Sequence, residues 1–157
     1  MKKAVDLKKL IEEMDVQIDQ YNTYVNRKTG EIIRVSSDRF RKVMDYEITP
    51  PYNNYQDWEI EEIKNCEDIA DNYDDYVEIP SKSEIDEYSV MECFCLSIED
   101  NKMRNELCRA VKGKGAFRRV RDRIERYDSE DEWYQDKKER LQEIAIAWCE
   151  ENGLKYK

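Results

Sequence analysis

Helical periodicity dominates the pattern of apolar and polar positions along the chain. Near the N-terminus, one helix face carries the apolar side chains of Val5, Leu7, Leu10, Ile11 and Met14. This spacing predicts a short amphipathic helix over about residues 5–14, whose first turn Asp6 or a neighbour can cap. The same spacing recurs between residues 57 and 71, and predicts a second helix there whose apolar positions are Trp58 or Ile60, then Ile63, Cys66, Ile69 and Ala70.

The period changes to that of β structure between residues 22 and 35. Two runs rich in Tyr, Val and Ile flank Lys28-Thr-Gly30, which predicts a hairpin with Gly30 in a left-handed conformation. We interpret Lys28-Thr-Gly30 as a turn and not as a phosphate-binding loop. Residues 76–79 alternate in polarity and end at Pro80, which predicts a third strand beside the hairpin.

Irregular structure is predicted between the hairpin and the helix at 57–71. Ser36-Ser-Asp38 has the composition of a helix cap, and residues 39–44 form a short helix or an irregular segment. Pro50-Pro51, surrounded by tyrosines, interrupts regular structure. We interpret residues 45–56 as a connection that lies on the body of the domain.

The C-terminal half is predicted to be helical throughout. Ser83 and Asp86 resemble a capping box before a helix whose apolar stripe is Tyr88, Met91, Cys95 and Ile98, with Phe94 beside it. A helix over about 100–112 should end at Gly113. The helical period restarts after Gly115 through Ala116, Phe117, Val120, Ile124 and Tyr127, and Asp128 closes that helix. A capping box at residues 129–132 predicts a last helix that stops at Gly153.

These elements predict one domain over residues 1–157 with an α+β fold that is mostly helical. A small antiparallel sheet, the hairpin plus one strand, is expected to pack with a C-terminal bundle of three or four helices. The residues expected in the core are Trp148, Leu141, Ile144, Phe117, Val120, Leu107, Met91 and Phe94.

Composition narrows the class of protein. The 157 residues are 39% hydrophobic and 41% charged with a formal net charge of −10, which argues against general binding to nucleic acid or a membrane surface. No apolar run is long enough to span a membrane, and the N-terminus does not resemble a signal peptide, so we expect a cytoplasmic protein. The five cysteines are expected to be buried free thiols.

Charge is unevenly spread along the chain. Residues 112–126 hold seven basic residues against two acids, a net of +5, whereas residues 55–100 hold sixteen acids against Lys64 and Lys82. One interpretation is structural: these regions face each other or neighbouring copies, or are solvated, and Arg118 or Arg119 pins a cap or loop. The other is an anion site made by Lys114, Arg118, Arg119 and Arg121 at a helix N-terminus, for a phosphate, a nucleic-acid backbone or an acidic protein.

Candidate chemistry is sparse. The sequence contains no histidine and no framed serine or cysteine nucleophile, so we assign no catalytic residue and lean against an enzyme. Cys93-Phe-Cys95 lacks the spacing of a zinc site. A carboxylate site for Mg²⁺ in the acidic stretch has no spacing signature, and no cofactor or metal is expected.

Several motifs together resemble a known family. They are Tyr88-x-x-Met91-Glu-x-Phe94, Asn105-Glu-Leu107, Gly113-Lys-Gly-Ala-Phe-Arg-Arg119, Trp133-Tyr134, Glu143-Ile-Ala-Ile146, Trp148 and Asn152-Gly153. With the Lys28-Thr-Gly-Glu hairpin and Tyr76-Val-Glu-Ile-Pro80, they resemble the bacterial uncharacterised protein family 0158. Val120 and Arg121-Asp122 depart from that family's usual Phe and Lys-Asp. The resemblance implies a small bacterial cytoplasmic protein with no assigned activity.

The function predicted from these observations is that of a small interaction protein with a polarised surface, whose partner is expected to be another protein. The alternative is a regulator that contacts nucleic acid or a phosphate-bearing ligand through residues 112–126. The sequence leaves the oligomeric state open.

Overall fold

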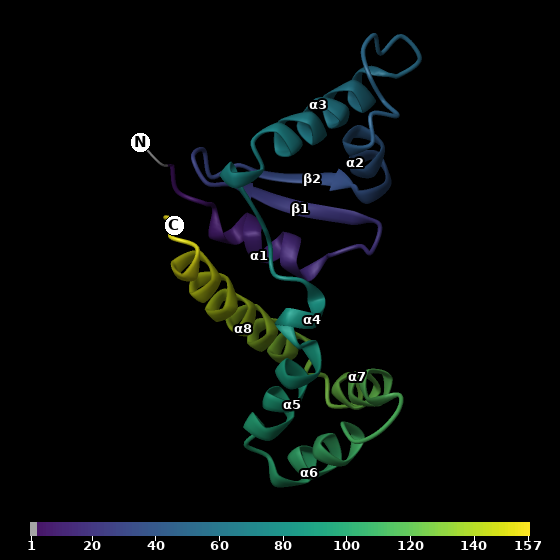
Figure 1. Ribbon diagram of the computed structural model, residues 1–157. Coiled ribbons are helices and arrows are strands. Elements are labelled where there is room, and N and C mark those ends of the chain that lie inside the picture. The colour runs from purple at the N-terminus through teal and green to yellow at the C-terminus, as the bar shows by residue number, and fades with distance from the viewer. Residues whose placement is uncertain (1–2) are drawn as a thin grey trace. The chain divides into compact units, whose positions relative to one another are not determined.

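The computed structural model describes residues 3–157, apart from the side chain of Ser83. Two compact units divide the chain (Figure 1). Unit 1 holds the residues up to Ser81 together with residues 145–157, and unit 2 holds residues 82–144. The expectation of a single domain stays a prediction.

A three-stranded antiparallel sheet lies at the centre of unit 1. Strands β1 (Tyr21–Asn26) and β2 (Ile32–Ser36) form the hairpin, and β3 (Tyr76–Glu78) pairs with the free edge of β1, so the strand order is β2-β1-β3. Tyr24 lies opposite Ile33 in one pair and opposite Glu78 in the other. The hairpin and the third strand beside it are therefore confirmed.

The hairpin turn is stabilised by the Asn26 side chain and depends on the left-handed backbone of Gly30. The Asn26 side-chain oxygen accepts hydrogen bonds from the backbone amides of Lys28 and Thr29, at 2.8 and 3.1 Å. Gly30 has φ +72°, and a Cβ atom there would lie 2.7 Å from the carbonyl oxygen of Ala4. The position therefore requires glycine both for its backbone conformation and for space.

Helices cover both faces of this sheet (Figure 1). Helix α1 (Leu7–Asp15), capped by Asp6, lies on one face, and α2 (Ser37–Met44), capped by Ser36, lies with α3 (Asp57–Asp71) on the other. Strand residues alternate between the faces, since Tyr24 and Val35 join the core under α2 and α3 while the buried Val25 points the other way. A short 3₁₀ helix, η1 (Tyr73–Asp75), leads into β3.

Polar contacts also stabilise unit 1. Arg39 of α2 pairs with Glu59 at 2.9 Å and Glu62 at 3.3 Å, and its guanidinium lies 5.7 Å from the ring centre of Trp58. The phenol of Tyr76 donates a hydrogen bond to Asp68, and burial together with this bond raises the pKa of Tyr76 to about 12. The chain ends are joined by the Val5 amide, which donates to the Lys155 carbonyl at 2.8 Å.

Unit 2 is helical. It contains α4 (Lys82–Ile85), α5 (Glu87–Ser97), α6 (Asn101–Ala110), α7 (Ala116–Arg126) and the first part of α8 (Glu130–Glu151). The core is formed by Met91, Phe94, Cys95, Ile98, Met103, Leu107, Ala110, Val111, Ala116, Val120 and Ile124. With the sheet of unit 1, these elements confirm a mostly helical α+β protein.

The start of α5 differs from the prediction. Asp86, in a left-handed conformation at φ +52°, separates α4 from α5 and caps α5 by accepting from the Ser89 amide at 3.2 Å. The predicted capping box made Asp86 the inner residue of a helix begun at Ser83, whose side chain lies outside the described residues. Asp86 caps instead because its backbone leaves the helical region there.

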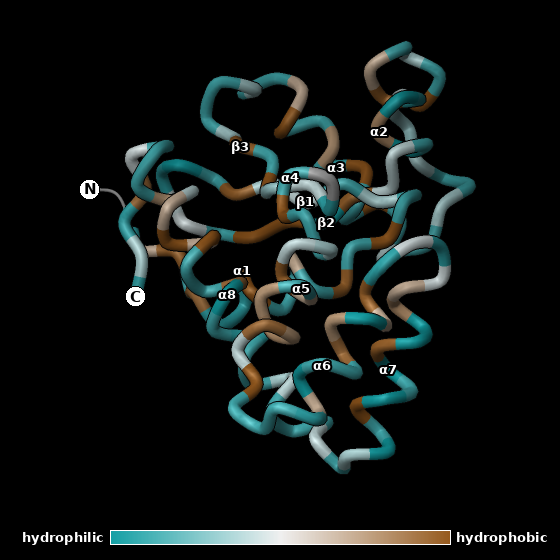
Figure 2. The backbone as a smooth tube through the Cα atoms, turned by 90° about the horizontal axis from the view of Figure 1, so that it is seen from below, coloured by the Kyte–Doolittle hydropathy of each residue, from teal (hydrophilic) through white to brown (hydrophobic). Residues whose placement is uncertain are grey.

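Most of the predicted core residues are buried, with two differences. Leu141, Trp148, Val120, Leu107, Met91 and Phe94 are buried, and Ile144 is partly buried. Phe117 is 46% exposed, so its assignment to the core was wrong. Ala116 takes the inward position ahead of Val120 and Ile124, which leaves Phe117 at the edge of the stripe. In Figure 2, hydrophobic bands interrupt a mainly hydrophilic α7.

The thiols are free, but they are not all buried. Cys66, Cys95 and Cys149 are buried, Cys108 is partly buried, and Cys93 is exposed. The expectation that all five would be buried was therefore wrong for Cys93, which lies on the outward side of α5. Within the described residues, no helix is long and apolar enough to cross a membrane.

Candidate anion-binding site at the α6–α7 joint

The turn between α6 and α7 is held by one arginine. The Nε of Arg119 donates to the carbonyl oxygen of Ala110 at 3.1 Å, and its two terminal nitrogens donate to the carbonyl oxygens of Lys114 and Lys112. The last carbonyls of a helix lack intrahelical partners and carry partial negative charge. Arg119 therefore satisfies the end of α6 and the turn that follows it, which is a structural role.

Gly115 makes this contact possible. It has φ +74° at the N-cap of α7, and a Cβ there would lie only 3.2 Å from the Nη1 atom of Arg119. A side chain at this position would face both the backbone cost of a left-handed conformation and crowding against the guanidinium. Position 115 therefore requires glycine both for its left-handed backbone and for the space that the Arg119 guanidinium occupies.

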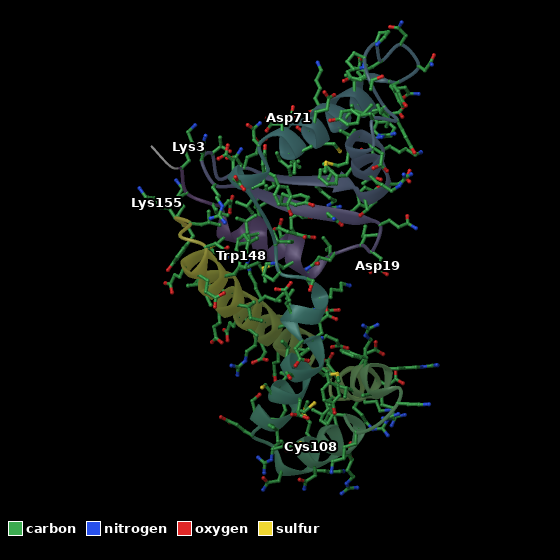
Figure 3. The ribbon with its side chains drawn as sticks, in the orientation of Figure 1. Lys3, Asp19, Asp71, Cys108, Trp148 and Lys155 are labelled. Carbon is green, nitrogen blue, oxygen red and sulfur yellow. The ribbon has the colours of Figure 1, made fainter. Side chains whose placement is uncertain are left out.

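A groove of about 400 Å³ lies between α6 and α7, and arginines dominate its lining. Its charged residues are Arg109, Arg119, Arg123, Arg126 and Glu106. Arg119, Arg123 and Arg126 have the i, i+4, i+7 spacing of one helix face, and Arg109 comes from the last turn of α6. Side chains tipped with nitrogen project from this part of unit 2, where Cys108 of α6 is labelled (Figure 3).

The groove leaves three of its arginines available. Among the described residues, no carboxylate makes an ion pair with Arg109, Arg123 or Arg126, although Glu106 lines the same groove. The neighbouring Glu106 carboxylate raises the pKa of the Tyr127 phenol. Three guanidinium groups can therefore donate to an anion that enters the groove.

The four residues predicted for an anion site are not brought together. Lys114 and Arg118 are exposed, Arg119 is engaged by carbonyls, and Arg121 lines a different cavity on another side of α7. A helix turns 100° per residue, so consecutive basic residues point to different sides. Arg109 was missed because it precedes the basic stretch. Its place in the last turn of the predicted helix before Gly113 was the available signal.

Several carboxylates of the acidic stretch at 55–100 have partners within unit 1. Glu59 and Glu62 pair with Arg39, and Asp75 pairs with Lys28 at 3.3 Å. The carboxylate of Glu67 accepts a hydrogen bond from Tyr52, and this bond raises the pKa of Tyr52 to about 12. These carboxylates thus have local structural partners.

A second groove in unit 2, of about 770 Å³, is acidic. Its carboxylates come from Glu99, Asp100, Asp131, Glu132, Asp136 and Glu139. All are exposed except Asp136, whose Oδ2 atom is buried without a hydrogen-bond partner and whose pKa is raised by burial. Across residues 3–157, no group of three or more His, Cys, Asp or Glu side chains is arranged to hold a metal ion.

Fold and site together define a mostly helical α+β protein with a small antiparallel sheet in unit 1 and an arginine-lined groove in unit 2. The chain belongs to the uncharacterised protein family UPF0158, whose model matches residues 3–157. That family has no assigned function, so it transfers no catalytic or binding residue to this chain. No match was found among curated proteins or among solved structures.

Proposed function

We propose that the protein is a small interaction protein that binds an acidic segment of a partner protein in the α6–α7 groove. The observation that supports this most directly is the convergence of Arg109, Arg123 and Arg126 on one concave surface without carboxylate partners. A guanidinium group offers donors in a fixed planar fork that matches a carboxylate.

An acidic peptide suits the groove better than nucleic acid does. The chain carries a net charge of −10, which repels a long polyanion whose length brings it near acidic surface outside the groove. A short acidic segment can reach the groove without approaching the acidic remainder. The alternative partner is a phosphate-bearing ligand or nucleic acid, since phosphate also accepts bidentate bonds from arginine.

Fluorescence anisotropy distinguishes these partners. A labelled Glu- and Asp-rich peptide, an uncharged peptide of equal length and a short nucleic acid are titrated at about 50 and about 200 mM salt. We expect the acidic peptide to bind, and its Kd to rise with salt. Tighter binding of nucleic acid at equal charge would favour the alternative, and no binding of either at the lower salt would refute both.

A matched pair of variants locates the binding surface. Arg123→Gln and Arg126→Gln each remove one charge from the groove, whereas Arg118→Gln removes the same charge from an exposed position of α7 that does not line it. We expect each groove variant to weaken binding at least about tenfold, since one charged hydrogen bond is worth about 1.5–3 kcal/mol. Equal losses from Arg118→Gln would show that total charge and not the groove determines affinity.

We also propose that the protein works in the cytoplasm of a bacterium. Five free cysteines, three of them buried, support a reducing compartment, in which thiols persist. Fractionation of cells that express a tagged chain tests this placement, and recovery in an oxidising compartment would contradict it.

A further inference from the structure

A cavity of about 150 Å³ in unit 2 lies apart from the arginine groove. Aromatic residues form one part of its lining: Phe117 from α7, and Trp133 and Tyr134 from α8. Phe117 is 46% exposed and Tyr134 is 64% exposed, so neither ring is accounted for by core packing. Exposed aromatic rings that converge on a concavity are typical of a recognition site.

The size of the cavity limits what it can take. A protein cavity of about 150 Å³ accommodates a group as large as benzene. The methylated ammonium head of a choline-like molecule falls in the same size class. A longer ligand would have to extend from the cavity into solvent, with only its head group enclosed.

Charge around the cavity favours a cation. Glu87, Glu125 and Glu130 line it, and among the described residues none of the three has an ion-pair partner. Aromatic rings attract cations through the negative charge on their faces, and carboxylates at the edge add to that attraction. The net charge of −10 raises the local concentration of cations further.

Two cationic residues also line the cavity, and a bound cation would have to compete with them. Lys137 already interacts within the chain, whereas Arg121 is exposed and makes no ion pair with a described carboxylate. An exposed arginine can turn toward solvent at low cost, because it gives up no partner. Arg121 is therefore the cation whose removal should help a cationic ligand.

We propose that this cavity binds an organic cation of the alkylated ammonium class through the rings of Phe117, Trp133 and Tyr134 and the carboxylates beside them. The proposal is independent of the arginine groove, because the two surfaces share no lining residue. It goes beyond the function proposed above by assigning a second ligand, of opposite charge, to unit 2.

Choline and its neutral tert-butyl isostere provide the test, with pivalate as the anion of similar shape. Binding to the full chain is followed by the indole N–H resonance of Trp133, assigned with Trp133→Phe, while the resonance of the exposed Trp58 in unit 1 serves as the internal reference. We expect choline to shift the Trp133 resonance with an affinity at least about tenfold above that of the isostere. Equal affinity of the two, or tighter binding of pivalate, would overturn the proposal.

Substitutions with matched controls test the assigned side chains. Tyr134→Leu should weaken choline binding severalfold, whereas Tyr73→Leu, at a position 62% exposed in unit 1, should not. Glu125→Gln should weaken binding and Arg121→Gln should strengthen it, while Glu61→Gln, exposed in unit 1, should leave it unchanged. Weaker binding after Arg121→Gln would contradict the assigned ligand charge. These exposed positions leave the core intact, so folding can be checked by circular dichroism.

Discussion

Replacing Arg119 tests the structural role of the basic stretch. Arg119→Met keeps an unbranched apolar stem at this position but removes every donor to the carbonyl oxygens of Ala110, Lys112 and Lys114. Those carbonyls then depend on water, and the end of α6 loses its positive partner. We expect the loss to appear as a lower free energy of unfolding and as fraying around the turn.

The size of this effect can be worked from the contacts. A hydrogen bond from a charged donor contributes about 1.5–3 kcal/mol, but these bonds share one half-buried side chain and the turn can rehydrate. We therefore expect a loss of about 2–3 kcal/mol for the whole set. For a chain of this length, that corresponds to a fall in Tm of about 5–10 °C.

Thermal and chemical denaturation followed by circular dichroism measure the loss, with Arg118→Met as the matched control. The control removes the same charge from the neighbouring residue, which is exposed, so its effect should stay within about 0.5 kcal/mol. Hydrogen exchange should also speed up in the Arg119 variant at the amide of Val111, which donates to Leu107 at 3.0 Å. Equal losses in the two variants, or unchanged exchange at Val111, would show that Arg119 does not stabilise the end of α6.

Three further predictions concern unit 1 and the thiols. Gly30→Ala should lower the free energy of unfolding by at least about 2 kcal/mol, because the new Cβ atom would clash with the Ala4 carbonyl. Gly153→Ala should cost only about 1 kcal/mol, for its left-handed backbone, because a Cβ atom there meets nothing within 4 Å. Equal costs would contradict the clash with Ala4. Ellman's reagent should label Cys93 in the native protein but reach the buried thiols only after unfolding, since burial raises their pKa; rapid labelling of all five would contradict this. The pKa of Tyr76 in the folded protein is about 12, so the unfolded phenol ionises first as the pH rises. The stability that Tyr76 contributes should therefore be complete below about pH 10 and be lost between about pH 10 and 12. Absorbance at alkaline pH measures the ionisation of the phenol, and Tyr76→Phe should flatten that part of the plot of stability against pH.

Local chemistry was enough to predict most of the secondary structure. Ser36 caps α2 and Gly30 closes the hairpin, as expected, since both depend on neighbours within a few residues. The third strand was also predictable, because a short alternating run needs a partner and the hairpin had a free edge. The boundary at Asp86 was missed, since a residue's left-handed backbone depends on how the chain turns between α4 and α5.

The basic stretch shows most clearly which features the sequence determines and which depend on the tertiary structure. Its charge, its two glycines and the restart of a helix at Ala116 all follow from the sequence. Only the folded chain shows that Arg119 binds carbonyls and that Arg109, ten residues earlier, faces Arg123 and Arg126 across a groove. Helical period alone sets the direction of each side chain relative to its neighbours, whereas the surface it meets depends on how α6 packs against α7. For the same reason, the sequence could place Phe117 on the apolar stripe of α7. It could not determine that Phe117 lies at the edge of this stripe and lines a cavity.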